Sequence, residues 1–279
     1  VGKSTLMNAL VGEKLSIITS KAQTTRHRIM GIVSGEDFQI VYSDTPGILK
    51  PSYKLQESMT KFVTGALTDA DVILYVTDTV EQSERSAEIV DSIRRSGIPT
   101  VVVINKIDLS TPEALEALVD KWQAEIPGAQ VVPTSAKENF NIEGLFRTIL
   151  SLLPEGPAFY PKDTLTDKTL RFFASEIIRE KILKFYDKEI PYCCEIEIES
   201  YKEEPTIDRI AATIYVARDS QKGILIGHKG EKLKRVGQTA REDMEQFLGK
   251  KVFLQLFVKV SDDWRNNERQ LRRFGYEQE

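Results

Sequence analysis

The sequence predicts an α/β domain with a doubly wound, mostly parallel β-sheet, followed by a smaller α+β domain. Apolar runs in the first part, such as residues 72–76, are continuous, as in strands covered on both faces, and they alternate with helical patterns. Later runs such as residues 195–199 alternate strictly between polar and apolar, which is typical of a strand with one buried face. Pro154, Pro157 and Pro161 lie between the two patterns, where neither helix nor strand can continue.

These patterns place each element of the first domain. We expect strands near residues 37–44, 71–78, 100–105 and 130–134, and helices near residues 3–12, 83–96, 113–126 and 141–153. The resulting division gives a first domain of residues 1–154, a linker of residues 155–166 and a second domain of residues 167–279, which includes a carboxyl-terminal helix.

The chain begins in the second half of a phosphate-binding pattern, Gly-x-x-x-x-Gly-Lys-Ser/Thr, here Val1-Gly2-Lys3-Ser4-Thr5. Gly2 lets the backbone approach a phosphate, and the amides at the start of the following helix donate to it. Lys3 would reach the β and γ oxygens, and the Ser4 hydroxyl would ligate Mg²⁺. Because such a loop follows a strand, we expect the first strand to lie upstream of Val1 and the chain to be truncated at its amino terminus.

A second motif, Asp44-Thr45-Pro46-Gly47, follows the apolar run of residues 38–42. A carboxylate that leaves a buried strand can hold the magnesium shell, so we predict Asp44 as a metal ligand. The amide of Gly47, which carries no side chain, can face the γ-phosphate.

Two further motifs predict a guanine base. Asn105-Lys106-Ile107-Asp108 follows the apolar run of residues 100–104, and Asp108 can accept hydrogen bonds from N1 and N2 of guanine, which adenine does not offer. Ser135-Ala136-Lys137 follows residues 131–134, and the Ala136 amide can donate to guanine O6. We predict that every residue of these two motifs except Ile107 binds the nucleotide. The other predicted nucleotide-binding residues are residues 1–5, Asp44 and Gly47.

Each motif alone has an ordinary structural explanation as a turn or a helix cap. All four in this order, each at the carboxyl end of an apolar strand, predict a GTP site. The arrangement resembles the translation-factor-related GTPases of the Ras-like superfamily. Where Ras carries a water-orienting glutamine, this chain has Ile48, which predicts slow hydrolysis.

The resemblance to Ras-like GTPases also places a switch that senses the γ-phosphate at residues 21–28. Within it Thr25 is the better candidate for the second magnesium ligand, and Thr24 is the reserve. A solvated polar loop is the alternative explanation of this segment. Lys3, Thr25 and Gly47 are the residues predicted to serve hydrolysis directly.

The elements of the second domain are expected in the order α-β-β-α-α-β, which resembles that of a type II KH domain. A helix is expected from about residue 167 to 186, and strands at residues 195–199, 210–217 and 252–260. Between the last two strands lies an apolar helix end, a Gly-x-x-Gly turn and a basic helix start, residues 224–234.

That turn predicts RNA binding. Gly227 and Gly230 let the backbone pass close to a sugar-phosphate chain, Lys229 adds a cation, and bases would lie over an apolar groove beside Ile224 and Ile226. A helix corner that needs glycine only for its geometry is the alternative, and His228 fits a solvated loop as well as a base or phosphate contact. The predicted RNA-binding residues are Ile224, Ile226, Gly227, His228, Lys229, Gly230, Lys232, Lys234 and Arg235.

Composition is compatible with this interpretation. The 279 residues carry a net charge of −4. From Leu165 onward, however, the chain has 22 Lys and Arg residues and 21 Asp and Glu residues, so the net charge of this part is +1. Local basic patches matter more than totals for phosphate binding. No apolar run reaches the roughly 20 residues that span a bilayer. Two adjacent cysteines without histidine nearby do not predict a zinc site.

A GTPase domain followed by one KH domain resembles the Era family, bacterial GTPases of small-subunit ribosome assembly. The specific matches are residues 23–28 (Gln-Thr-Thr-Arg-His-Arg), residues 174–181 (Ala-Ser-Glu-Ile-Ile-Arg-Glu-Lys) and the ending from Trp264 to Tyr276. The resemblance implies GTP or GDP and Mg²⁺ as ligands, and binding of the 3′ end of 16S ribosomal RNA on the small subunit. It implies that GTP favours the RNA-competent state, a cytoplasmic location with peripheral association at the inner membrane, and a monomer.

Two alternatives are another ribosome-associated GTPase and an RNA-binding protein without catalytic activity. The Der GTPases carry two GTPase domains before a KH-like domain, whereas this chain shows one GTPase domain and a Gly-x-x-Gly turn. A non-catalytic RNA-binding module with a vestigial nucleotide domain would not be expected to keep Lys3, Ser4, Asp44 and Asp108. Nucleotide binding separates this second alternative from a GTPase.

Overall fold

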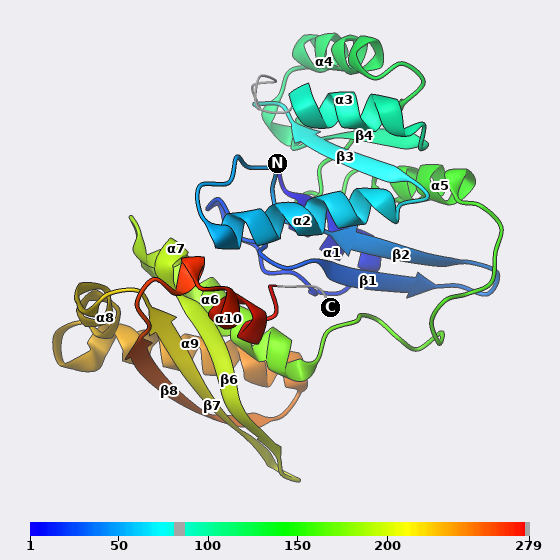
Figure 1. The fold of residues 1–279 in the computed structure, drawn as a ribbon. Coiled ribbons are helices and arrows are strands. Elements are labelled where there is room, and N and C mark those ends of the chain that lie inside the picture. The colour runs from blue at the N-terminus through cyan, green and yellow to red at the C-terminus, as the bar shows by residue number, and fades with distance from the viewer. Residues whose placement is uncertain (81–86, 277–279) are drawn as a thin grey trace. The chain divides into compact units, whose positions relative to one another are not determined.

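A computed structural model describes residues 1–80 and 87–276. The chain forms two compact units, shown in Figure 1. Unit 1 comprises residues 1–16, 28–48 and 63–167, and unit 2 comprises residues 17–27, 49–62 and 168–279. Two segments of the predicted first domain, residues 17–27 and 49–62, therefore belong to the unit that contains the predicted KH domain.

The parallel sheet of unit 1 contains β3 (Ile73–Asp78), β4 (Thr100–Asn105) and β5 (Gln130–Pro133) in that order. All six residues of β4 are buried, because an apolar central strand is covered on both faces. The helices around these strands are α3 (Ala87–Ser96), α4 (Pro112–Glu125) and α5 (Ile142–Leu152), with a short 3₁₀ turn, η2 (Ile107–Leu109). The start of the helix predicted at 83–96 falls partly outside the described residues.

An antiparallel hairpin of β1 (Ile29–Ser34) and β2 (Gln39–Asp44) completes the described strands of unit 1 and packs against α1 (Lys3–Val11). The predictions included β2 and α1 but missed β1. They also missed α2 (Lys54–Thr68), whose buried Leu55, Met59 and Phe62 recur at helical spacing.

Unit 2 has the predicted α-β-β-α-α-β order. Its sheet runs β6-β7-β8, with β6 antiparallel and β8 parallel to β7. Along β8 the predicted alternation is present: Val252 is buried, while Phe253 and Phe257 of the opposite face are exposed. The elements are α6 (Leu170–Phe185), α7 (Ile190–Cys193), β6 (Glu195–Glu203), β7 (Ile207–Val216), α8 (Asp219–Ile226), η3 (His228–Gly230), α9 (Glu231–Leu248), β8 (Lys251–Val260), η4 (Trp264–Asn266) and α10 (Glu268–Arg273).

The main core of unit 2 lies between the sheet and helices α6, α8 and α9, and includes Ile178, Ile214 and Val236. A second cluster joins α2 to the carboxyl-terminal segment through Met59, Trp264 and other side chains. Among the described helices, none combines the length and the apolar character that crossing a membrane requires.

Candidate nucleotide site and RNA interface

The remnant of the phosphate loop adopts the conformation that its glycine permits. Gly2 has φ +85°, in the left-handed region, and α1 begins at the next residue. A methyl group on Gly2 would lie 2.7 Å from Asn105 Nδ2, and that same nitrogen donates to the Val1 carbonyl at 3.0 Å. The first and third motifs are therefore in contact. The amides at the start of α1 have no intrahelical acceptor, which makes this end suitable for a phosphate.

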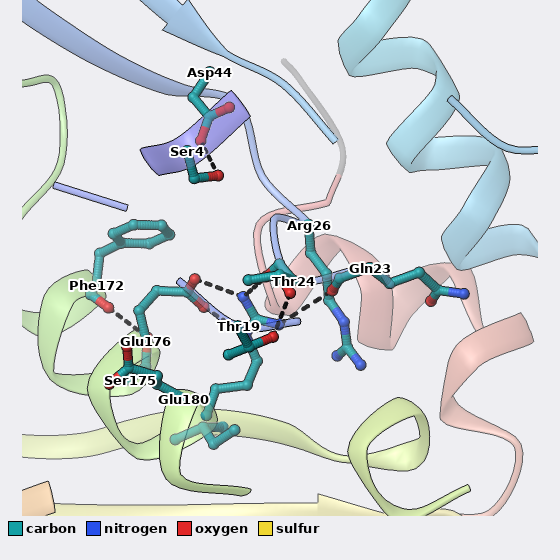
Figure 2. A network of polar contacts seen from close by, with 12 residues as sticks. Ser4, Thr19, Gln23, Thr24, Arg26, Asp44, Phe172, Ser175, Glu176 and Glu180 are labelled. Atoms are coloured by element: carbon teal, nitrogen blue, oxygen red, sulfur yellow. Dashed lines mark hydrogen bonds and ion pairs between the residues drawn. The ribbon is translucent and has the colours of Figure 1, made fainter. Parts of the chain in front are cut away.

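The two oxygen ligands predicted for Mg²⁺ in unit 1 lie side by side. Ser4 Oγ donates to Asp44 Oδ2 at 2.7 Å, as Figure 2 shows, and Asp44 is buried at the end of β2. A hydroxyl and a buried carboxylate are hard oxygen donors that suit Mg²⁺, so these residues fit the ion. A methyl group on Gly47 would lie 3.7 Å from Lys3 Nζ, so the ammonium and this glycine face the same region.

The third and fourth motifs are joined by two hydrogen bonds. Asn105 Oδ1 accepts from the Ala136 amide at 2.9 Å, and Asp108 Oδ1 accepts from Ser135 Oγ at 2.6 Å. Asn105 and Ser135 are buried, whereas Asp108 is exposed and available to a base. Lys137 extends beside them and pairs with Glu138 at 2.9 Å.

One residue of the site was missed. Asp78, at the end of β3, accepts a hydrogen bond from Lys106 Nζ at 2.6 Å and one from the Val80 amide at 3.1 Å. Burial alone would raise the pKa of Asp78, but these two bonds hold the pKa below its usual value. Lys106 itself has φ +62°, in the left-handed region that few non-glycine residues adopt. The only sequence signal was an aspartate that ends an apolar strand, as Asp44 does.

The structure does not bring the predicted switch residue into unit 1. Thr25 is buried in unit 2, so its assignment as a magnesium ligand remains a prediction. Its alternative, Thr24, has a hydroxyl that bonds Thr19 Oγ1 and the Lys21 carbonyl, both at 2.6 Å.

The Gly-x-x-Gly turn of unit 2 is open to solvent and needs its glycines. Gly227 has φ +74° and a methyl group there would lie 2.7 Å from Lys232 Cγ, while Gly230 has φ +80°. His228 and Lys229 are exposed, and Ile224 beside them is 46% exposed.

Cations extend from the turn along the first part of α9. Lys232, Lys234 and Arg235 are all exposed. The prediction missed two aromatic residues next to these cations, Phe185 at the end of α6 and Tyr186 directly after it. The Arg235 guanidinium lies 4.3 Å from the centre of the Phe185 ring, and Lys232 Nζ lies 5.8 Å from the centre of the Tyr186 ring. Exposed cations with aromatic neighbours suit a single-stranded nucleic acid.

Comparison with known proteins identifies a GTPase domain and a KH domain in this chain. The chain matches the family model of a 50S ribosome-binding GTPase over residues 1–106 and that of a KH domain over residues 189–265. It is 44% identical to the GTPase Era of Alkaliphilus metalliredigens over 280 residues, covering 99% of this chain and 95% of that protein. The GTPase Era of Staphylococcus haemolyticus is 43% identical over 278 residues, covering 99% of this chain and 93% of that protein.

Two solved structures are similar over nearly the whole chain. One is Era in complex with MgGDPNP and nucleotides 1506–1542 of 16S ribosomal RNA, with a TM-score of 0.96, 40% identity and coverage of 100% of this chain and 95% of that chain. The other is a variant of Aquifex aeolicus Era bound to GDP·AlF₄⁻, with a TM-score of 0.95, 40% identity and coverage of 99% and 95%. These matches favour a single GTPase domain with a KH domain over the arrangement of Der.

Proposed function

The chain belongs to the Era family of GTPases, and we propose that the two sets of motif residues described above bind GTP or GDP and ribosomal RNA, respectively. It is a GTPase and an rRNA-binding factor of ribosome assembly, and its ligands are GTP or GDP and Mg²⁺. The observation that supports the nucleotide site is that side chains of different motifs contact each other. Ser4 contacts Asp44, and Ser135 contacts Asp108, although each pair is far apart in the sequence.

We assign the phosphates and the metal to one end of the nucleotide site. Ser4, Asp44 and Thr25 would hold Mg²⁺, and the bound ion would neutralise charge on the β- and γ-phosphates. Lys3 adds a second positive charge, and the Gly47 amide donates to the γ-phosphate. The base belongs at the other end, where Asp108 accepts from guanine, supported by Asn105, Lys106, Ser135, Ala136 and Lys137. Val1, Gly2 and Thr5 complete the phosphate-binding set.

Hydrolysis by these residues is expected to be slow. Ile48 follows Gly47 and is 48% exposed, but its side chain has no group that could orient a water molecule. Stabilisation of charge by Lys3, the metal ligands and the Gly47 amide is then the main contribution of this chain.

For RNA we propose that the turn formed by residues 227–230 clamps about four nucleotides of the 3′ end of 16S ribosomal RNA. The sugar-phosphate chain would pass Gly227 and Gly230, and bases would lie over Ile224 and Ile226. His228, Lys229, Lys232, Lys234 and Arg235 would meet the phosphates or stack on bases.

The test reverses the charge of the turn. In His228→Asp, Lys229→Asp, two carboxylates stand where phosphates must lie, and loss of charge-assisted contacts of about 1.5–3 kcal/mol each predicts RNA binding at least about tenfold weaker. Binding to a 16S 3′-end oligonucleotide and to GTP is measured on the same protein. GTP affinity should stay unchanged.

A matched control variant changes the net charge by the same amount at positions outside the Gly-x-x-Gly turn. Lys202→Asp, Thr206→Asp alters the net charge equally at two exposed residues of the same unit. RNA binding that is unchanged in the turn variant, or equally weakened in the control, would show that the turn is only a structural corner.

The finer assignments rest on the family resemblance. We propose a monomer that is cytoplasmic and associates peripherally with the inner membrane, and we propose domains at residues 1–154 and 167–279 with a linker at 155–166. Light scattering tests the mass in solution, cell fractionation tests the location, and limited proteolysis tests the linker.

A further inference from the structure

The helix α8 ends directly before the Gly-x-x-Gly turn, and a distant side chain binds its last turn. The carbonyl groups at the end of any helix have no donor within the helix. The Leu225 carbonyl, two residues before Gly227, accepts a hydrogen bond from Tyr186 Oη at 2.6 Å. Tyr186 lies 39 positions earlier in the chain. Its hydroxyl therefore caps α8 at the point where the RNA-binding turn begins.

Tyr186 is itself held firmly in unit 2. The residue is 4% exposed and belongs to the same core as Leu225, which is fully buried. Its amide donates to the Ile182 carbonyl at 3.1 Å, at the end of α6. Burial raises the pKa of Tyr186 to about 12, so the hydroxyl stays protonated at neutral pH and remains a donor. The Leu225 carbonyl thus meets a donor with a fixed position.

The ring of Tyr186 also contacts the helix on the other side of the turn. Lys232 Nζ of α9 lies 5.8 Å from the ring centre, within the range of a cation–π interaction. A methyl group on Gly227 would lie 2.7 Å from Lys232 Cγ, so the stem of this lysine lies close to the turn. Tyr186 therefore contacts both helices that flank the turn, α8 through its hydroxyl and α9 through its ring.

The turn between these helices needs such support. Gly227, Lys229 and Gly230 all have positive φ, at +74°, +49° and +80°. A non-glycine residue keeps this conformation only where its surroundings determine it, and glycine is free to adopt many others. Without an anchor, the turn would have to be ordered when RNA binds, which costs affinity.

We propose that Tyr186 is a positioning residue for RNA binding, which holds the Gly-x-x-Gly turn and Lys232 in the arrangement that meets the sugar-phosphate chain. This inference rests on the proposed function, in which residues 227–230 clamp RNA. Because Tyr186 is buried, it acts through the turn and not by touching RNA.

The test uses Tyr186→Phe in the complete chain. Phenylalanine keeps the ring beside Lys232 and the volume of the core, and removes only the donor to the Leu225 carbonyl. One neutral hydrogen bond corresponds to a factor of about two to ten in an equilibrium constant. We expect affinity for a single-stranded 16S 3′-end oligonucleotide to fall by about this factor, with GTP affinity unchanged. Without RNA, the amides of Gly227 and Gly230 should exchange hydrogen faster than in the wild type.

The matched control is Tyr215→Phe on β7 of the same unit. Tyr215 is 7% exposed, and its hydroxyl donates to Glu197 Oε2 at 3.0 Å. Both variants lose one hydrogen bond of a buried tyrosine, so urea unfolding should show both to be less stable than the wild type. RNA affinity and exchange at the turn should change only in Tyr186→Phe. An equal loss of RNA affinity in the two variants would overturn the inference.

A double-variant cycle tests whether Tyr186 acts through the turn. Alanine at Gly227 is disfavoured by the positive φ and by the contact with Lys232, so Gly227→Ala distorts the turn. The double variant Gly227→Ala, Tyr186→Phe should then bind RNA no more weakly than Gly227→Ala alone. Additive losses would overturn the inference.

Failure of the inference and failure of the proposed function give different results. If Tyr186→Phe binds RNA as the wild type does while His228→Asp, Lys229→Asp loses binding, the inference is wrong and the proposed RNA site stands. If the charge-reversed turn variant itself binds RNA as the wild type does, the proposed site is wrong, and the inference fails with it.

Discussion

Replacing Asp108 with asparagine tests the guanine site most directly, because the change keeps the size of the side chain and removes one acceptor. In the structure Ser135 Oγ already donates to Asp108 Oδ1 at 2.6 Å. An asparagine can keep this bond with its amide oxygen, and its NH₂ group then takes the place of Oδ2. That donor would face the donors of guanine.

The magnitude follows from this geometry. One hydrogen bond to a charged group, about 1.5–3 kcal/mol, is lost, and an unpaired donor is left under the base, so GTP affinity should fall by at least about tenfold to a hundredfold. Xanthine presents an oxygen where guanine has its 2-amino group, and the new NH₂ group can donate to it. Affinity for xanthosine triphosphate should therefore rise.

Titration of both nucleotides by calorimetry or with fluorescent analogues gives the result. Asp120→Asn, an exposed aspartate on α4 of the same unit, is the matched control and should leave both affinities unchanged. Equal GTP affinity in the wild type and Asp108→Asn would refute the assignment of the base to Asp108.

Two further outcomes are expected. Ile48→Ala should lower turnover little, and a loss beyond about a hundredfold, or about 2.7 kcal/mol in barrier, with unchanged GTP affinity would show that Ile48 contributes directly. Burial lowers the pKa of His27, stacked 4.3 Å from Tyr276, to about 4. The unfolded chain then binds the proton first, so stability is full above about pH 6.5 and falls as the pH drops towards 4, by about 1–2 kcal/mol at pH 5. Urea unfolding at pH 7 and 5 should show this loss in the wild type but not in His27→Gln, and equal losses in both would contradict it.

The nucleotide motifs could be predicted because their signals are local. Two of them follow the parallel strands β4 and β5, and parallel strands bring their carboxyl ends to one edge of a sheet. The strand β4 shows this, since its buried run leads directly to Asn105 and on to Asp108. The order of helices and strands in the KH domain could also be predicted, because the apolar residues of a helix and of a half-buried strand recur with different periods.

The position of residues 17–27 could not be predicted in the same way. The segment has no periodic apolar pattern, and its polar residues fit a solvated loop. Arg26 is buried only because acceptors almost 170 positions later, Pro191, Cys194 and Glu195, surround it. Contacts of this kind depend on the tertiary structure and leave no local mark. The helix α2 is different, since Leu55, Met59 and Phe62 do carry a helical spacing that was overlooked.

The helix α6 contacts both the segment of residues 17–27 and the helix α9 within unit 2. On it Arg179 holds the Thr24 carbonyl, while Lys181 bonds Glu180 at 3.1 Å and Asp243 of α9, the helix that begins after the RNA-binding turn. Both sets of buried charges therefore lie on one helix of unit 2. Because coupling between two binding sites is reciprocal, the factor by which GTP changes RNA affinity must equal the factor by which RNA changes GTP affinity.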